Sequence, residues 1–133
     1  MRELVLNTDG AARHNPGPAA LGVVIAENGQ VIKTISEYVG ETTNNVAEYL
    51  AVIRGLEEAM SLGAERVQIR SDSELLVKQI NGQYKVKNEG LRPLYLLVKV
   101  LMEKFTEVSF LHINREQNKE ADWLANKALD AKN

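Results

Sequence analysis

The residues of this sequence that could do chemistry are four acids, each placed where one element is expected to give way to the next. Asp9 and Asp72 follow apolar runs that predict strands, and Glu48 and Asp122 fall near the starts of predicted helices. Strand ends and helix starts can meet at one edge of a layered α/β fold. Carboxylates gathered there would raise one another's pKa unless cations were present. Oxygen ligands without Cys or His favour Mg²⁺, Mn²⁺ or Ca²⁺ over zinc, and two such ions about 4 Å apart can promote phosphodiester hydrolysis.

Three of the four acids also have an ordinary structural explanation. Asp9 can accept hydrogen bonds within the turn that follows it. Glu48 and Asp72 stand near helix starts, where the helix dipole favours negative charge. Taken one at a time, these explanations suffice. The repetition of the same placement favours a shared site, although the spacing of the residues does not by itself show that they converge.

The elements that would position these acids begin with a strand. Leu4, Val5 and Leu6 form a short apolar run, typical of a strand buried on both faces, which leads directly into Asp9. Asn28-Gly29 between two β-branched runs predicts a hairpin. The other expected strands are Leu21–Ala26, Val31–Val39, Arg66–Arg70 and Val108–Ile113.

Segments with helical spacing of apolar residues lie between the last three of these strands and after the final one. In the first helix, Val52, Gly55 and Ala59 form a stripe of small residues that places Glu48 beside the sheet, and Thr43 or Asn44 can serve as its N-cap. The expected helices are Asn45–Leu62, Glu74–Ile80, Pro93–Phe105 and Lys119–Ala131. The order β-β-β-α-β-α-α-β-α predicts an α/β fold with a five-stranded mixed sheet, three antiparallel strands followed by parallel additions.

Three further local structural predictions follow from residue type and position. Ser71 to Glu74 has the pattern of a capping box that opens the second helix. Asn118 is expected to be the N-cap of the last helix, and Trp123 is expected to anchor that helix by packing against the sheet.

Composition limits the class of protein. The 133 residues are expected to form a single domain, 1–133, with an ordinary 44% of hydrophobic residues. The absence of cysteine excludes a disulfide framework and a thiolate metal site. No secretory signal or membrane span is recognised, so a soluble, cytoplasmic protein is expected. A net charge of −2 counts against a simple electrostatic nucleic-acid binder, so a nucleic-acid substrate would need local positive charge or metal ions.

Five motifs, in order and spread over essentially the whole chain, resemble those of type 1 ribonuclease H. They are TDG at 8–10, NPGPAALG at 15–22, TTNNVAEYLAVIRGL at 42–56, SDSELLVKQINGQYKVK at 71–87 and NREQNKEADWLAN at 114–126. Each is weak alone, but together they are highly specific. The resemblance implies the ribonuclease H-like fold and cleavage of the RNA strand of RNA/DNA hybrids, giving 5′-phosphate and 3′-hydroxyl ends.

The resemblance also implies residue roles. Asp9, Glu48, Asp72 and Asp122 correspond to the catalytic acids that hold two Mg²⁺ ions, with Mn²⁺ as an alternative. Substrate contacts are implied for Asn15, Thr43, Asn44 and Asn45, whose polar side chains suit the backbone and 2′-OH groups of a hybrid. The short NGQYKVKN segment resembles short-form members, archaeal and bacterial, that lack a basic protrusion, so Lys85 and Lys87 would supply the phosphate contacts there.

Two residues compete for the assisting role that a mobile-loop histidine has in many relatives. Arg115 lies in a polar loop seven residues before Asp122 and keeps its charge at any working pH. His112 alternates with Val108 and Phe110, which predicts a packed, structural imidazole. Arg115 is therefore the predicted catalytic assistant. Arg13 and His14 are equally compatible with phosphate contact and with solvated loop charge.

Alternatives to a hybrid nuclease remain open at this stage. The protein could also cleave double-stranded RNA, as the resemblance to short-form members allows, or bind hybrid without cutting. A calcium-stabilised structural domain would explain the acids but would not need Asn44 and Asn45. A monomer without membrane association is expected.

Overall fold

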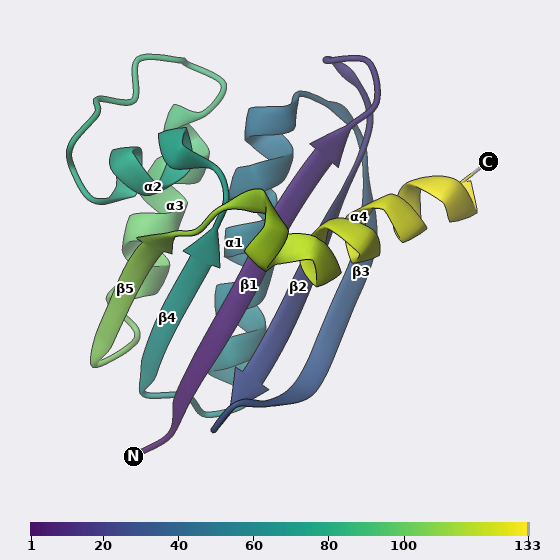
Figure 1. The fold of residues 1–133 in the computed structure, drawn as a ribbon. Helices are drawn as coiled ribbons and strands as arrows, with labels where there is room; N and C mark the ends of the chain where they lie inside the picture. The colour runs from purple at the N-terminus through teal and green to yellow at the C-terminus, as the bar shows by residue number, and fades with distance from the viewer. Residues whose placement is uncertain (133) are drawn as a thin grey trace.

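The computed structural model describes residues 1–132, which are built around a five-stranded mixed sheet in the order β3-β2-β1-β4-β5 (Figure 1). The strands β1, β2 and β3 form an antiparallel meander, whereas β4 runs parallel to β1 and β5 runs parallel to β4. This confirms the predicted sheet. The strands are β1 (Glu3–Ala12), β2 (Gly17–Glu27), β3 (Gln30–Thr42), β4 (Arg66–Ser71) and β5 (Glu107–His112).

Helices cover both faces of the sheet (Figure 1). The first three lie on one face, where they enclose the main hydrophobic core with β1, β2 and β4, and α4 crosses the other face, over a smaller apolar cluster that includes Val24. None of the helices within residues 1–132 is long and apolar enough to cross a membrane. The helices are α1 (Asn44–Ser61), α2 (Glu74–Ile80), α3 (Arg92–Met102) and α4 (Lys119–Lys132), the last preceded by a 3-10 helix, η1 (Arg115–Asn118).

Two glycines allow α1 and α4 to rest closely on the sheet. A Cβ atom at Gly55 of α1 would lie 2.9 Å from a methyl group of Leu6, and a Cβ atom at Gly22 of β2 would lie 2.1 Å from the carbonyl oxygen of Ala121. Val52 and Ala59, which flank Gly55 along α1, are fully buried. The predicted small-residue stripe therefore does face the sheet, and α4 contacts the opposite face through its own backbone.

The local signals for turns and caps are largely confirmed. Asn28 and Gly29 adopt positive φ angles of 53° and 77°, as a two-residue hairpin turn requires. Thr43 caps α1, because its Oγ1 accepts a hydrogen bond from the Val46 amide at 3.2 Å. The first strand is longer than expected. It continues past Asp9 to Ala12 because β2 goes on pairing with it.

Three local predictions are wrong. Ser73, not Ser71, caps α2, since its side chain accepts from the Leu76 amide. Asn118 does not cap α4, because α4 continues directly from η1, and the capping box instead joins Asn114 and Gln117. Trp123 does not anchor α4: it is 60% exposed. The sheet-facing positions of α4 are taken by Ala121, Leu124, Ala125 and Leu129.

Candidate active site

The site lies at the edge of the sheet where β4 has ended but its neighbour β1 continues. Backbone pairing between the two strands stops at Thr8 and Ser71. Beyond that point, side chains take the hydrogen bonds that a strand would have made along this edge of β1. The amide of Gly10 donates to Glu48 Oε1 at 2.8 Å, and the amide of Ala12 donates to Asn44 Oδ1 at 2.7 Å. The open edge of the central strand therefore fixes two residues of α1 by direct hydrogen bonds.

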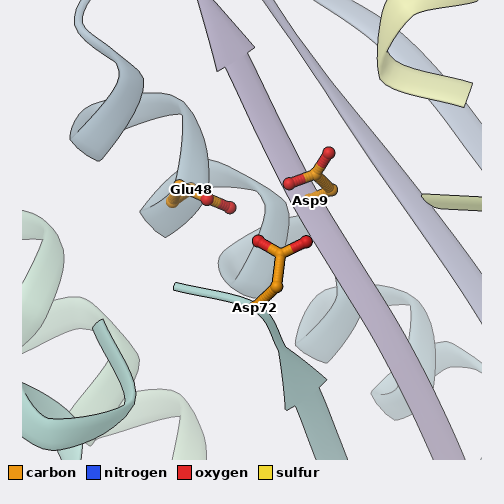
Figure 2. A group of neighbouring side chains, drawn as sticks. All are labelled: Asp9, Glu48 and Asp72. Carbon is orange, nitrogen blue, oxygen red and sulfur yellow. The ribbon is translucent and has the colours of Figure 1, made fainter. Parts of the chain in front are cut away.

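Three of the predicted acids converge at this edge. Asp9 of β1, Glu48 of α1 and Asp72, just after β4, each offer a carboxylate oxygen, and these oxygens all lie within 4.8 Å of one another. Figure 2 shows the three carboxylates directed toward a common space. Asp9 is only 5% exposed, and the other two are partly buried. The arrangement provides hard oxygen ligands for a divalent cation.

Gly10 explains how Glu48 reaches the cluster. A Cβ atom at position 10 would lie 2.2 Å from the carbonyl carbon of Ala47 and 2.3 Å from the amide of Glu48. Any larger residue would therefore force the first turns of α1 away from β1. In the pair Asp9-Gly10, Asp9 supplies a carboxylate, and Gly10 leaves the space in which the backbone of Glu48 can approach β1.

Asp122 lines the same hollow without belonging to the tight group of three. The hollow is a polar cavity of about 330 Å³ whose walls include the acids, Arg115 and Asn126. Asn126 lies one turn after Asp122 on α4 and donates to its Oδ1 at 3.3 Å. The cavity thus holds a fourth carboxylate and one permanent positive charge.

Two acids of the cluster, Asp9 and Glu48, have raised pKa values. Burial is the main cause that raises the pKa of Asp9 to about 9, and repulsion from Glu48, Asp72 and Asp122 adds to it. Burial likewise raises the pKa of Glu48 to about 8, while the Gly10 amide and the charge of Arg115 act in the opposite direction. Protons therefore compensate the cluster at neutral pH when cations are absent. Divalent cations would take their place, and the all-oxygen ligand set fits Mg²⁺ or Mn²⁺.

Comparison with known proteins identifies the family. A family model described as reverse transcriptase-like matches residues 7–128. Ribonuclease HI of Halobacterium salinarum is 40% identical over 123 residues, which cover 92% of this chain and 62% of that protein. A bifunctional protein of Mycobacterium tuberculosis is 40% identical over 131 residues, which cover 97% of this chain and 36% of that protein. The chain therefore spans between about one third and two thirds of the length of these relatives.

The similar solved structures belong to the same family as the similar sequences. The crystal structure of the Halobacterium salinarum enzyme superimposes with a TM-score of 0.95 at 38% identity, covering 97% of this chain and 98% of that one. LC11-RNase H1, solved in complex with an RNA/DNA hybrid, gives 0.93 at 43% identity, with the same coverages of 97% and 98%. The chain belongs to the type 1 ribonuclease H family. Its relatives and neighbours place it with the short-form members.

One residue of this ribonuclease H domain that sequence reasoning missed is Asn118. It is 1% exposed. Its amide nitrogen donates to the Thr8 carbonyl at 2.9 Å and to Asp72 Oδ2 at 3.2 Å, and its oxygen accepts from Asn7 at 3.1 Å. Asn118 thus connects the two strands that supply Asp9 and Asp72. The sequence singled out Asn118 because a polar residue directly before a helix is typical of a cap. Its side chain instead bonds to Asn7, Thr8 and Asp72.

Two of the predicted substrate residues, Asn15 and Asn44, are connected by a hydrogen bond at the start of α1. Asn15 Oδ1 accepts from the Asn44 amide at 2.9 Å, and Asn44 in turn accepts from Ala12. Asn15, Asn44 and Asn45 are exposed, and Thr43 is partly exposed. Asn44 also lines the acid cavity. Three amides on the surface beside the acids suit contacts with a nucleic-acid backbone.

The predicted basic contacts lie apart from the acids. Lys85 and Lys87 are exposed in the segment between α2 and α3, where they line a separate hollow of about 670 Å³ together with Tyr84 and Arg92. Arg13 is paired with Asp130 at 2.6 Å. In the described part of the chain, the one basic residue lining the acid cavity is Arg115.

The expectation for His112 is wrong in part. His112 is exposed at the end of β5, although Phe110, two residues earlier, is buried. Strand β5 is an edge of the sheet, and the apolar side of its alternation ends with Phe110. His112 is therefore not held in the core, and it does not line the acid cavity.

Proposed function

We propose that this chain is a metal-dependent endonuclease that hydrolyses the RNA strand of RNA/DNA hybrids. The observation that carries the proposal is the group of carboxylates from β1, α1 and the end of β4, whose ligand oxygens lie within 4.8 Å of one another in an open polar cavity. Buried acids with raised pKa values, such as Asp9 and Glu48, are concentrated at functional sites. The family to which the chain belongs, and the hybrid bound to LC11-RNase H1, support this substrate.

In the proposed reaction, a water oxygen attacks the phosphorus and the bond to the 3′ oxygen breaks, which leaves 5′-phosphate and 3′-hydroxyl ends. Asp9 and Asp72 would hold cations between them, and Glu48 and Asp122 would complete the two ligand sets. Two Mg²⁺ ions, or Mn²⁺ in their place, would supply Lewis acidity to the phosphodiester and to the water when bound. Arg115 would neutralise charge on the phosphate as the bond breaks.

Substrate recognition would be shared between two surfaces. Asn15, Asn44 and Asn45 would contact the hybrid beside the acids, where amide groups can both donate to and accept from a 2′-OH. Thr43 would contact a phosphate of the DNA strand. Lys85 and Lys87 would contact phosphates farther along, which fits their position on a separate hollow. The domain boundaries 1–133, the monomeric state and the cytoplasmic location stay predictions.

The decisive experiment compares labelled RNA/DNA hybrid, RNA duplex, DNA duplex and single-stranded RNA, each with Mg²⁺, Mn²⁺ or EDTA. Cleavage of the hybrid with either cation and none in EDTA is expected, and the products should carry 5′-phosphate ends. Cleavage of RNA duplex at a comparable rate would establish the broader nuclease. Binding of hybrid without cleavage under any condition would contradict the proposal and leave a binding module.

A further inference from the structure

The aromatic ring of Trp123 is left unexplained by the fold and by the proposed chemistry. It is the single tryptophan of the sequence and is 60% exposed. Four smaller residues of α4 already fill the contact with the sheet. A large apolar ring on the surface costs hydration free energy unless something covers it.

A lysine side chain lies over the exposed ring of Trp123. The Nζ of Lys127, one helical turn later, lies 5.3 Å from the centre of the indole. Lys119 precedes Trp123 by four residues, so the three side chains form a row along the exposed side of α4. Both lysines are exposed. The neighbouring Glu120 reduces the net charge of the row, so the ring and not the charge is its main binding feature.

The row follows two cavity-lining residues along α4. Asp122 and Asn126 line the acid cavity, and Trp123 and Lys127 are the residues that directly follow them on α4. Each successive residue of a helix is displaced by roughly 100° around the axis and about 1.5 Å along it. The ring therefore lies outside the cavity, on the outward side of α4 and one residue beyond Asp122. A strand that leaves the acids past Asp122 and continues over the outward side of α4 would meet this ring.

We propose that Trp123, with Lys127, is a stacking platform for an unpaired nucleotide of the RNA strand beside the hybrid segment that is cut. The inference rests on the proposed function. Within a hybrid the faces of the bases are covered by their neighbours, whereas an unpaired nucleotide offers a free face to an indole. Stacking on an aromatic side chain tolerates any base, and a cation near the ring strengthens it. The platform would favour hybrids that continue into single-stranded RNA over blunt ones.

The test uses the tryptophan itself as the probe, in the Asp9→Asn variant so that binding is observed without cleavage. Blunt hybrid, and hybrids with a four-uridine extension on the RNA strand at its 5′ or 3′ end or on the DNA strand, are titrated while the indole fluorescence is followed. One of the RNA extensions should quench the fluorescence and bind about 5- to 100-fold more tightly than the blunt hybrid. Equal fluorescence changes and affinities for all four hybrids would overturn the proposal.

Variants with Asp9 intact give the second readout, the KM for cleavage. Trp123→Ala should abolish the advantage of the extended hybrid while leaving kcat on blunt hybrid unchanged, and Trp123→Phe should restore part of it. Tyr38→Ala is the matched control. Tyr38 is also exposed beneath a lysine, Lys132 at 5.3 Å, but it lines a different hollow, whereas Trp123 directly follows the cavity-lining Asp122. An advantage that persists in Trp123→Ala would overturn the platform. A wild-type protein that cleaves no hybrid would instead refute the proposed function, a result that the fluorescence titration does not depend on.

Discussion

The two halves of β1 differ in what bonds to the edge that faces β4. From Glu3 to Thr8 the strand pairs with β4, and from Val5 onward it pairs with β2 as well; its inward residues Leu4 and Leu6 are almost completely buried. From Asp9 to Ala12 only β2 pairs with it, and the opposite edge binds side chains of α1. The first half stabilises the fold through apolar burial. The second half gathers acids whose charged forms the fold disfavours.

The difference shows how a sheet can acquire a site without a special loop. Ending β4 at Ser71 releases backbone groups of the central strand, and these groups then position the side chains of Glu48, Asn44 and Asn118. The first half, packed into the core, anchors the polar half that continues from it. The contrast between the halves can be tested by substitution on each side of Thr8.

The largest effect is expected from Asp9→Asn. Loss of one shared ligand should lower cleavage of hybrid by about a thousandfold or more, as removal of central catalytic groups commonly does, with the fold retained by circular dichroism. The matched change in the first half is Leu6→Ala, which should cost about 2–5 kcal/mol of unfolding free energy while the folded protein still cleaves. Near wild-type cleavage by Asp9→Asn would contradict the two-metal assignment.

The next effect concerns the positive charge in the cavity. Arg115→Ala should lower turnover by about tenfold or more, because one charge-assisted contact to the phosphate is lost, with little change in melting temperature. His112→Ala serves as the control. It should alter the free energy of unfolding by less than about 0.5 kcal/mol, since the imidazole is exposed. Collapsed turnover in a folded His112→Ala variant, beside an active Arg115→Ala variant, would reverse the two roles.

The polar half should also make stability depend on pH. The pKa of Asp9 is raised to about 9 and that of Glu48 to about 8, so the folded protein keeps protons that the unfolded chain releases near pH 4. Their contribution to the free energy of unfolding is therefore full below about pH 4, falls as the pH rises toward 9, and levels off above it. The melting temperature of the wild type in EDTA should decline between about pH 4 and pH 9. The decline should be less steep for Asp9→Asn in EDTA, and less steep for the wild type when Mg²⁺ replaces EDTA. Parallel curves for the two proteins in EDTA would contradict the raised pKa values.

The smallest effect is expected far from both halves of β1. Each phosphate neutralised on a duplex adds about −0.9 to the slope of log affinity against log salt concentration. Lys85→Ala combined with Lys87→Ala should therefore make the slope shallower by about 2 at most, with a modest rise in KM. The wild-type slope should itself be shallow, given the net charge of −2. A slope that indicates roughly 6 to 10 phosphate contacts would reveal a basic surface beyond these residues.

Much of the architecture could be predicted because its signals are periodic or local. Alternating and helical spacing predicted all five strands and the four α-helices in order, and Asn28-Gly29 predicted the hairpin turn. The acids could be selected because each was expected near the end or start of an element, although Asp9 lies within β1, three residues before its end. Their convergence could not be derived from spacing alone, since it depends on where β4 ends relative to β1.

Two of the wrong predictions, those for Asn118 and Trp123, share a physical cause, which is that tertiary contacts overrode a local preference. Asn118 has the residue type of a cap, but the chain enters α4 through η1, and its amide is used between two strands instead. Trp123 has the residue type of a core anchor. Because α4 lies on the sheet at Gly22, its inner side has room for Ala121 and Ala125 but not for an indole.

That contact at Gly22 has a consequence for the geometry of the acids. Gly22 is the residue of β2 directly opposite Asp9, and it is also where the backbone of α4 rests, one residue before Asp122. A close approach of main-chain atoms therefore brings the helix that carries Asp122 against the strand that pairs with Asp9. For protein engineering, this makes position 22 a place from which the distance between ligands can be altered while all four carboxylates remain unchanged.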